Sequence, residues 1–115
     1  MTESHVTEIR NNRDRSRYEI VVDGVVAGFL QYAMRGGRVV LAHTEVPEAN
    51  AGRGLATSLV RGALDDIRQR GLYIVPVCPF VERFIERRPE YDDLVDHDMF
   101  DALNSEAQRG PGGSG

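Results

Sequence analysis

Two glycines, one cysteine and one histidine are the residues of this chain whose types and spacing suggest chemistry. Gly52 and Gly54, together with the small Ala56, stand between a β-rich run and a run with helical periodicity. Such a turn points bare backbone N–H groups and the positive end of a helix dipole at one spot, which suits a phosphate group. The alternative is that the glycines only make the turn before the helix, since short glycine patterns are frequent.

Cys78 is the only cysteine of the chain. It follows the β-rich run Tyr73–Val77 and precedes a predicted helix that begins at Pro79 or Phe80 and ends near residue 88. Proline suits a first helical turn, and a thiol at a helix N-terminus gains thiolate character because the dipole favours the anion. The sequence therefore makes Cys78 a candidate nucleophile; the alternative is a small buried hydrophobic residue.

His43 is the candidate general base, because imidazole titrates near neutral pH. It lies on the predicted strand Arg38–Val46, so the alternative is a half-buried residue that only pairs across a sheet. His5 and His97 have no comparable context and are expected at the surface. No spacing of His, Cys, Asp and Glu is typical of a metal site, and one cysteine excludes a thiolate cage.

The elements that position these residues can be predicted from their periodicity. The run Thr57–Arg70 predicts a helix that Gly71 ends, with an apolar face made by Leu55, Leu59, Ala63 and Ile67. The first half of the chain predicts an antiparallel part of a sheet, with hairpin turns at Asp23-Gly24 and Gly36-Gly37. Two later strands linked by a crossover helix then favour a mixed, mostly antiparallel α/β (α+β) sheet.

Four short motifs occur in order between His43 and Val95. They are Thr44-Glu45-Val46-Pro47, Gly52-Arg53-Gly54-Leu55-Ala56, Val75-Pro76-Val77-Cys78-Pro79-Phe80 and Arg87-Arg88-Pro89-Glu90-Tyr91. In this combination the chain resembles the GNAT acyltransferase superfamily, and more narrowly its short stand-alone N-acetyltransferase domain-containing proteins. A dinucleotide-binding fold is a weaker reading, because Thr57 stands where a third glycine is needed and only one crossover unit is present.

The resemblance implies a GNAT-like fold with a β-α-β crossover, and a binding site for acetyl-CoA. The pantetheine arm would insert between two diverging strands, with His43 on one wall and Cys78 on the other, as the catalytic residues. The resemblance assigns cofactor binding to Thr44, Glu45, Val46, Ala51, Gly52, Arg53, Gly54, Leu55, Ala56, Thr57, Pro79, Phe80 and Arg83. Ala51 departs from the superfamily, which usually has Gln or Arg there to contact the diphosphate.

Charged residues after Cys78 allow two interpretations. Arg83, with Arg87 and Arg88, is a candidate for the 3′-phosphate of the nucleotide. The alternative is a solvent-exposed charged face that these arginines share with Glu82 and Glu86. The acids at residues 65, 66, 92 and 93 are likewise expected on solvated helix faces, and a closing helix is expected over Tyr91–Leu103.

Composition limits the class of protein. The 115 residues are expected to form one GNAT-like domain over residues 1–109, followed by a flexible glycine-rich tail at 110–115. A net charge of −4 with interspersed arginines argues against nucleic acid as a partner. No apolar run approaches the roughly 20 residues that span a bilayer, and no signal pattern begins the chain, so a cytoplasmic protein is expected.

The leading hypothesis is an acetyl-CoA-dependent N-acyltransferase of minimal size that acts on an amine whose identity the sequence does not give. The second is a non-catalytic acyl-CoA-binding module, motivated by the shortness of the chain. A third is a structural interaction domain in which Gly52 and Gly54 serve only the fold. A monomer or a weak homodimer fits all three.

Overall fold

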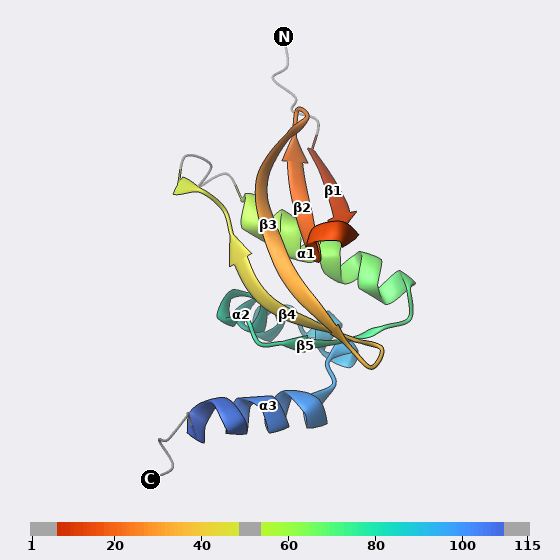
Figure 1. The fold of residues 1–115 in the computed structure, drawn as a ribbon, viewed down its shortest axis with the longest axis vertical. Helices are drawn as coiled ribbons and strands as arrows, with labels where there is room; N and C mark the ends of the chain where they lie inside the picture. Colours follow the sequence, from red (N-terminus) through yellow and green to blue (C-terminus); the bar gives the residue numbers. More distant parts are fainter. Residues whose placement is uncertain (1–6, 49–53, 110–115) are drawn as a thin grey trace.

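The computed structural model describes residues 7–48 and 54–109 of the chain. Within these residues the chain forms five strands, three α-helices and short 3₁₀ segments; Figure 1 shows their arrangement. In chain order they are β1 (Thr7–Asn12), η1 (Arg13–Arg15), β2 (Arg17–Val22), β3 (Val25–Arg35), β4 (Arg38–Glu45), α1 (Leu55–Gln69), β5 (Tyr73–Pro76), α2 (Pro79–Arg87), η3 (Pro89–Leu94) and α3 (His97–Arg109).

The strands form one sheet in the order β1-β2-β3-β4-β5. The first four pair antiparallel, and β4 pairs with β5 in parallel. Parallel neighbours need a crossover connection, and α1 provides it. The predicted mixed, mostly antiparallel sheet with a β-α-β crossover is therefore confirmed.

Both predicted hairpin turns are present, and their backbone explains their sequence. Asp23 and Gly24 have φ angles of 51° and 85°, and Gly36 and Gly37 have 57° and 81°. Positive φ at both central residues is the mark of the type I′ turn, whose twist matches that of the flanking strands. These turns connect β2 to β3 and β3 to β4 directly.

Gly71 ends α1 as predicted. Its φ is 71°, its N–H donates to the carbonyl of Arg68, and the N–H of Leu72 donates to the carbonyl of Ile67. This pair of bonds is the Schellman arrangement, which satisfies carbonyls that the helix leaves open. Glycine is favoured there because it has no Cβ to oppose a left-handed backbone.

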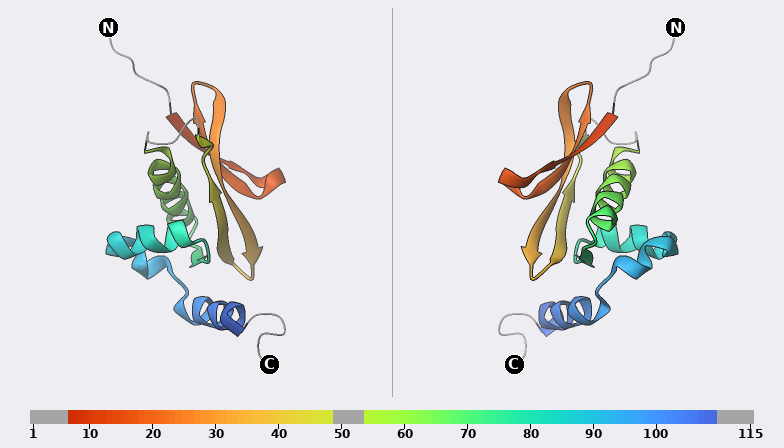
Figure 2. Two further views of the ribbon diagram at one scale, coloured as in Figure 1. Left: turned by 90° about the vertical axis from the view of Figure 1, so that its left-hand side faces the viewer. Right: turned by 90° about the vertical axis from the view of Figure 1, so that its right-hand side faces the viewer.

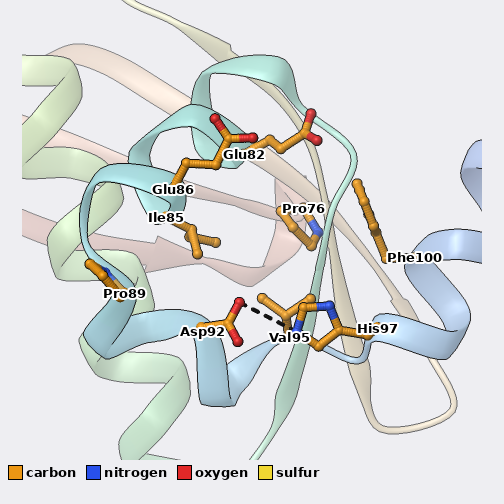
Figure 3. A pocket seen from close by; sticks show the side chains of 9 residues that line it. All are labelled: Pro76, Glu82, Ile85, Glu86, Pro89, Asp92, Val95, His97 and Phe100. Carbon is orange, nitrogen blue, oxygen red and sulfur yellow. Dashed lines mark ion pairs between the residues drawn. The ribbon is translucent and has the colours of Figure 1, made fainter.

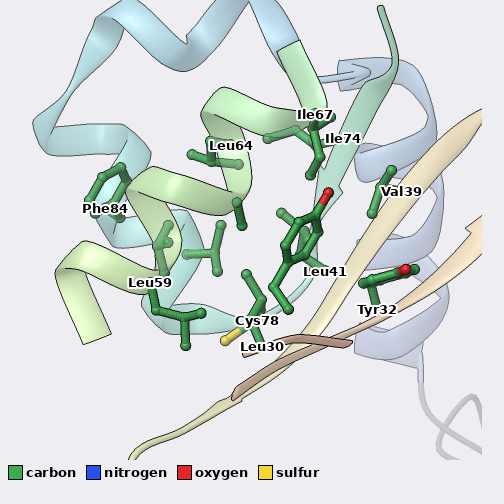
Figure 4. Close-up of a cluster of buried hydrophobic side chains, with 14 of the residues drawn as sticks. Leu30, Tyr32, Val39, Leu41, Leu59, Leu64, Ile67, Ile74, Cys78 and Phe84 are labelled. Atoms are coloured by element: carbon green, nitrogen blue, oxygen red, sulfur yellow. The ribbon is translucent and has the colours of Figure 1, made fainter. Parts of the chain in front are cut away.

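Helices α1 and α2 lie on one face of the sheet, and among the described residues no helix covers the opposite face (Figure 2). The core between the two layers holds fully buried side chains such as Leu30, Leu41, Leu59, Leu64 and Ile74 (Figure 4). Each such side chain stabilises the fold by about 1.5–3 kcal/mol relative to an exposed one. The uncovered face of the sheet is called the open face below.

The C-terminal region differs from the expectation. The predicted helix over Tyr91–Leu103 is wrong, because η3 ends at Leu94 and α3 begins at His97, with Asp96 accepting the N–H of Met99 at 3.0 Å as a cap. Helix α3 lies at one end of the molecule instead of over the sheet (Figure 1). Strand β5 also ends one residue earlier than expected, because Pro76 has no N–H for the ladder.

Two acids of α1 make hydrogen bonds to tyrosines; Asp65 is exposed as expected, whereas Asp66 is half-buried. Asp66 accepts the hydroxyl of Tyr18 at 2.7 Å and the Nε of Arg70 at 2.7 Å. Asp65 accepts the hydroxyl of Tyr91 at 2.8 Å. These bonds satisfy tyrosine hydroxyls at the edge of the core, so both acids fasten α1 to its neighbours.

Gly62, in the middle of α1, is packed against β1. A Cβ added there would lie 2.5 Å from Cγ1 and 3.0 Å from Cβ of Ile9. We therefore expect Gly62→Ala to lower the free energy of unfolding by about 1–2 kcal/mol, because overpacking outweighs the gain in helix propensity. Urea unfolding measures this, with Ser58→Ala on the exposed side of α1 as the control. A stabilised Gly62→Ala would contradict the close packing of α1 on β1.

Glu19 is 4% exposed on the open face. Its Oε2 accepts from Nε of Arg17 at 2.8 Å and from Nδ2 of Asn12 at 3.0 Å, and the Arg17 guanidinium lies 4.4 Å from the centre of the Phe29 ring. Burial alone would raise the pKa of Glu19, but the bonds from Arg17 and Asn12 together hold that pKa below its ordinary value of 4.5. The charged form of the Glu19 carboxylate is therefore favoured in the folded state.

This lowered pKa predicts a pH dependence. A group with a lower pKa in the folded state adds stability above its ordinary pKa, and that stability is lost as the pH falls through the folded value. The unfolding free energy of Glu19→Gln should therefore lie furthest below that of the wild type near neutral pH. The two should converge below about pH 4.5. Urea titrations across this range measure the difference, with the exposed Glu8→Gln as control; parallel curves would contradict the assignment.

The part of the chain that the structure describes holds no helix long and apolar enough to cross a membrane. It also holds no group of three or more His, Cys, Asp and Glu side chains placed to bind a metal ion.

Candidate active site

Strands β4 and β5 separate after a short parallel ladder. The ladder runs from the pair Arg38 and Tyr73 to the pair Leu41 and Pro76, and the N–H of Cys78 then donates to the carbonyl of Leu41 at 2.8 Å. Beyond this point β4 continues to Glu45 beside β3 alone, while the chain after β5 turns into α2 (Figure 1). Among the described residues, β4 therefore has a backbone edge without a strand partner after Leu41.

A β-bulge at Ala42 decides which side chains face that opening. Tyr32 pairs with Leu41, but its neighbour Gln31 pairs with His43, so Ala42 is an extra residue in β4. Past the bulge Thr44 pairs with the fully buried Leu30 and shares its face of the sheet. The alternation of the strand then puts His43 on the open face.

Thr44 and Cys78 meet where the strands separate. The Thr44 Oγ1 lies 3.3 Å from the Cys78 Sγ, and either atom can donate the hydrogen. Cys78 is 4% exposed and belongs to the core cluster that also contains Leu30 and Leu59 (Figure 4). Cys78 is also the N-cap of α2, so its thiol contacts the Thr44 hydroxyl within apolar surroundings.

His43 does not face Cys78, contrary to what the resemblance suggested. Its side chain is 59% exposed, its Nε2 lies 3.2 Å from Oε1 of Glu45, and its ring packs on the edge of Phe29 with 6.2 Å between ring centres. The wall opposite Cys78 is Thr44 instead. The two predicted catalytic residues therefore lie on opposite faces of the sheet.

The N-terminus of α1 has the features of an anion site. Gly54, at the N-cap, has φ 70° and ψ 15°, and it makes no side-chain cap bond. The first turn of α1 contains no acidic residue, and the N–H of Ser58 donates to the carbonyl of Gly54 at 3.1 Å. The positive end of the helix dipole is therefore not neutralised by a carboxylate from α1 itself.

Three arginines of α2 and its C-cap lie beside this helix end. Arg83, Arg87 and Arg88 line a small cavity of about 150 Å³ together with Phe80, Phe84 and Thr57 from the first turn of α1. No ion pair joins Arg83 or Arg87 to an acid among the described residues. The structure thus brings the predicted Arg83 to the predicted Thr57 and Phe80, and the combined positive charge suits a phosphate.

The remaining predicted cofactor residues have different surroundings. Leu55 is buried in the core, so only its backbone can face a ligand, whereas Ala56 is half-buried and Pro79 is exposed. Glu45 is exposed at the end of β4, and Val46 packs against the core. Ala51, Gly52 and Arg53 lie outside the described residues.

Gly28, in the middle of β3, was not among the predicted site residues. A Cβ there would lie 2.8 Å from Cγ2 of Val46 and 2.9 Å from the carbonyl oxygen of Glu45. The absence of a side chain at residue 28 therefore lets the end of β4 lie close against β3. A glycine inside a predicted strand is the sequence signal that could have indicated this close approach.

The family model for the GCN5-related N-acetyltransferase matches residues 17–94. Protein NATD1 of Bos taurus is 32% identical over 83 residues, which are 70% of this chain and 74% of that protein. Protein NATD1 of Xenopus tropicalis is 29% identical over 91 residues, 77% of this chain and 84% of that protein.

A solved structure of a GCN5-like protein from Staphylococcus aureus is similar in fold. It has a TM-score of 0.59 and 21% sequence identity, over 76% of this chain and 86% of the other. The matched family residues 17–94 include β2 to η3, and so contain both the Thr44 and Cys78 pair and the arginines of α2. This chain belongs to the GCN5-related N-acetyltransferase family.

Proposed function

We propose that this protein is an acetyl-CoA-dependent N-acyltransferase of minimal size. The observation that carries the proposal is the combination of an open β4 edge, a thiol at the head of the opening, and an anion site at the next helix. All three belong to one continuous unit, β4-α1-β5-α2. Acetyl-CoA carries a thioester at one end of an extended arm and phosphates at the other. Its chemical groups therefore occur in the same order as these three features of the protein.

Residues of the chain fit each part of acetyl-CoA. The N–H groups of the first turn of α1, with Arg83 and Arg87, would hold the phosphates, because both are positive and neither is paired with an acid among the described residues. The backbone of Thr44 to Val46 would bond the amides of the pantetheine arm as a strand does. Because residue 54 is a glycine, no side chain at this position would obstruct the phosphates.

Acetyl-CoA supplies an acetyl thioester, from which an amine takes the acetyl group as a C–N bond replaces the C–S bond. The N–H groups of the β4 edge would stabilise negative charge on the carbonyl oxygen during this exchange. Cys78 would lie beside the acetyl group, and the hydroxyl of Thr44, 3.3 Å from Sγ, would orient its thiol. His43, beside Glu45 on the open face, would take the proton of an amine that approaches from solvent.

Titration of the purified protein with acetyl-CoA by calorimetry tests the proposal. Gly54→Val should abolish saturable binding, because its side chain would obstruct the phosphates at the end of α1. Gly71→Val is a matched control, since Gly71 has nearly the same φ, 71° against 70°, has equally open space for a Cβ, and lies at the other end of α1. Thermal unfolding of both variants verifies that they fold.

The outcomes separate the candidate functions. Binding that Gly54→Val loses and Gly71→Val keeps supports a CoA site at the N-terminus of α1. Binding without transfer to any of a broad panel of amines would favour the non-catalytic acyl-CoA-binding module. No heat and no thermal stabilisation at millimolar acetyl-CoA would exclude both functions.

A further inference from the structure

A second cavity, of about 420 Å³, is lined by other residues of α2 than the cavity with the arginines (Figure 3). Its apolar surface includes Pro76 of β5, Ile85 of α2, Val95 after η3 and Phe100 of α3. Three carboxylates, Glu82, Glu86 and Asp92, also line it. It is called the acidic cavity below, and its volume is in the range of small-molecule sites.

The carboxylates form two groups across the apolar surface. Glu82 and Glu86 lie together on one side in Figure 3, and Asp92 lies on the other side. The Oδ1 of Asp92 is 3.4 Å from Nε2 of His97, which also lines the cavity. An apolar strip thus separates two negatively charged ends.

No arginine is among the described residues that line the acidic cavity, although the chain has 14 basic residues. Glu82 and Glu86 are four apart on a helix, an arrangement of like charges that costs roughly 0.2–0.5 kcal/mol. Neither forms an ion pair within the described part of the chain. The negative charge of Glu82 and Glu86 is therefore not balanced by an ion pair with the described side chains around the cavity.

The two flanks of α2 carry opposite charge. Arg83 and Arg87 line the small cavity by the N-terminus of α1, while Glu82 and Glu86 line the acidic cavity. The sequence allowed these four residues to share one solvated face, and the structure separates them by sign. One side of the helix suits an anion, and the other suits a cation.

We propose that the acidic cavity binds an aliphatic polyamine. Methylene groups would lie on Pro76, Ile85 and Phe100, and ammonium groups would lie at the two carboxylate ends. A compact metal ion would leave the apolar strip uncovered, and a neutral apolar molecule would leave the carboxylates unpaired in the cavity. A polyamine covers the apolar strip with its aliphatic chain and pairs the carboxylates with its ammonium groups.

The cavity adjoins the proposed acetyl site without being part of it. Pro76 precedes Cys78 by two residues, and the N–H of Glu82 donates to the carbonyl of Cys78 at 3.0 Å. Polyamine binding needs no acetyl-CoA and no transfer. It can therefore be measured by itself, whatever the outcome for the enzyme.

The test is calorimetric titration of the full chain with spermidine, together with ¹H–¹⁵N NMR to locate the site. Saturable binding with shifts at Glu82, His97 and Phe100 is expected. Glu82→Gln combined with Glu86→Gln should weaken binding by about tenfold or more, because it removes one charged end while keeping the side-chain shape. Glu8→Gln combined with Asp14→Asn removes the same charge from β1 and η1, and should leave binding within about twofold.

Two other ligands and one further variant test the specificity of spermidine binding. Mg²⁺ at the same concentration should not displace spermidine, and n-butylamine, with one charge, should bind more weakly. Phe100→Ala should weaken binding without changing charge, and thermal unfolding verifies that each variant folds. No binding, equal losses in the two double variants, or full displacement by Mg²⁺ would overturn the proposal.

Discussion

Cys78→Ala is expected to lower the rate of acetyl transfer at least about 100-fold, the usual size of losing a positioned nucleophilic or acid–base group. Binding of acetyl-CoA should persist, because the proposed phosphate site lies at α1 and α2, away from the thiol. The loss of rate is expected because the Sγ lies where β4 and β5 separate, 3.3 Å from the Thr44 Oγ1. Steady-state rates with calorimetric binding measure the two effects separately.

The composition of the chain allows acetylation of Cys78 to be detected by mass spectrometry. All 14 basic residues are arginine, so an acetyl group can stay only on the N-terminus, on Cys78 or on a hydroxyl. Intact mass after incubation with acetyl-CoA distinguishes two routes. An adduct that Cys78→Ala removes supports transfer through the thiol, and a fully active protein without that adduct supports direct attack by the amine.

Thr44→Val is the companion variant, because it keeps the shape of residue 44 and removes the hydroxyl that contacts Sγ at 3.3 Å. If Thr44 positions the thiol, kcat should fall with little change in KM, and Thr44→Ser should restore it. Ser58→Ala, on the exposed side of α1, is the control for the loss of a hydroxyl. Unchanged kinetics in both Cys78→Ala and Thr44→Val would remove this pair from the mechanism.

The second large effect is expected on affinity. Arg83→Gln combined with Arg87→Gln should weaken acetyl-CoA binding by about 100-fold, since charge-assisted bonds to a ligand contribute about 1.5–3 kcal/mol each. Binding should also become less dependent on salt. Both arginines line the cavity at the N-terminus of α1 and have no acidic partner among the described residues.

The matched control is Arg15→Gln combined with Arg35→Gln, which removes the same charge from η1 and the end of β3. Equal losses in the two double variants would mean that only the overall charge of the protein attracts acetyl-CoA. If the wild type and both double variants bind acetyl-CoA with equal affinity, the phosphates lie elsewhere on the chain.

Glycines made much of the fold predictable. Gly24, Gly37 and Gly71 each have positive φ, and a residue that is needed for such a backbone can be recognised in a sequence. Strand β1 was not predicted, because among Thr7–Asn12 only Ile9 is apolar and the strand is held by pairing with β2. Its contact with Gly62 is tertiary, and no local pattern indicates it.

The elements that carry the candidate residues were predictable, and the geometry between those residues was less so. Cys78 lies between β5 and α2, and Arg83 lies on α2, as the sequence predicted. The position of Thr44, rather than His43, opposite the thiol follows from the bulge at Ala42. Regular alternation cannot reveal an extra residue, since a bulge is decided by pairing with the neighbouring strand. The separation of charge across α2 was hidden for the same reason, because it depends on what each flank contacts.

Within the described part of the chain, the edge of β4 after Leu41 has no strand partner, and this bears on how the protein avoids aggregation. An edge that accepts an extended ligand accepts an extended peptide equally well, and exposed strand edges are templates for self-association. Here the exposed stretch is short, it carries the charged Glu45, and a bulge interrupts its regular spacing. Acetyl-CoA bound at the proposed site would cover the same edge of β4. The cofactor would then also prevent β4 from pairing with a strand of another molecule.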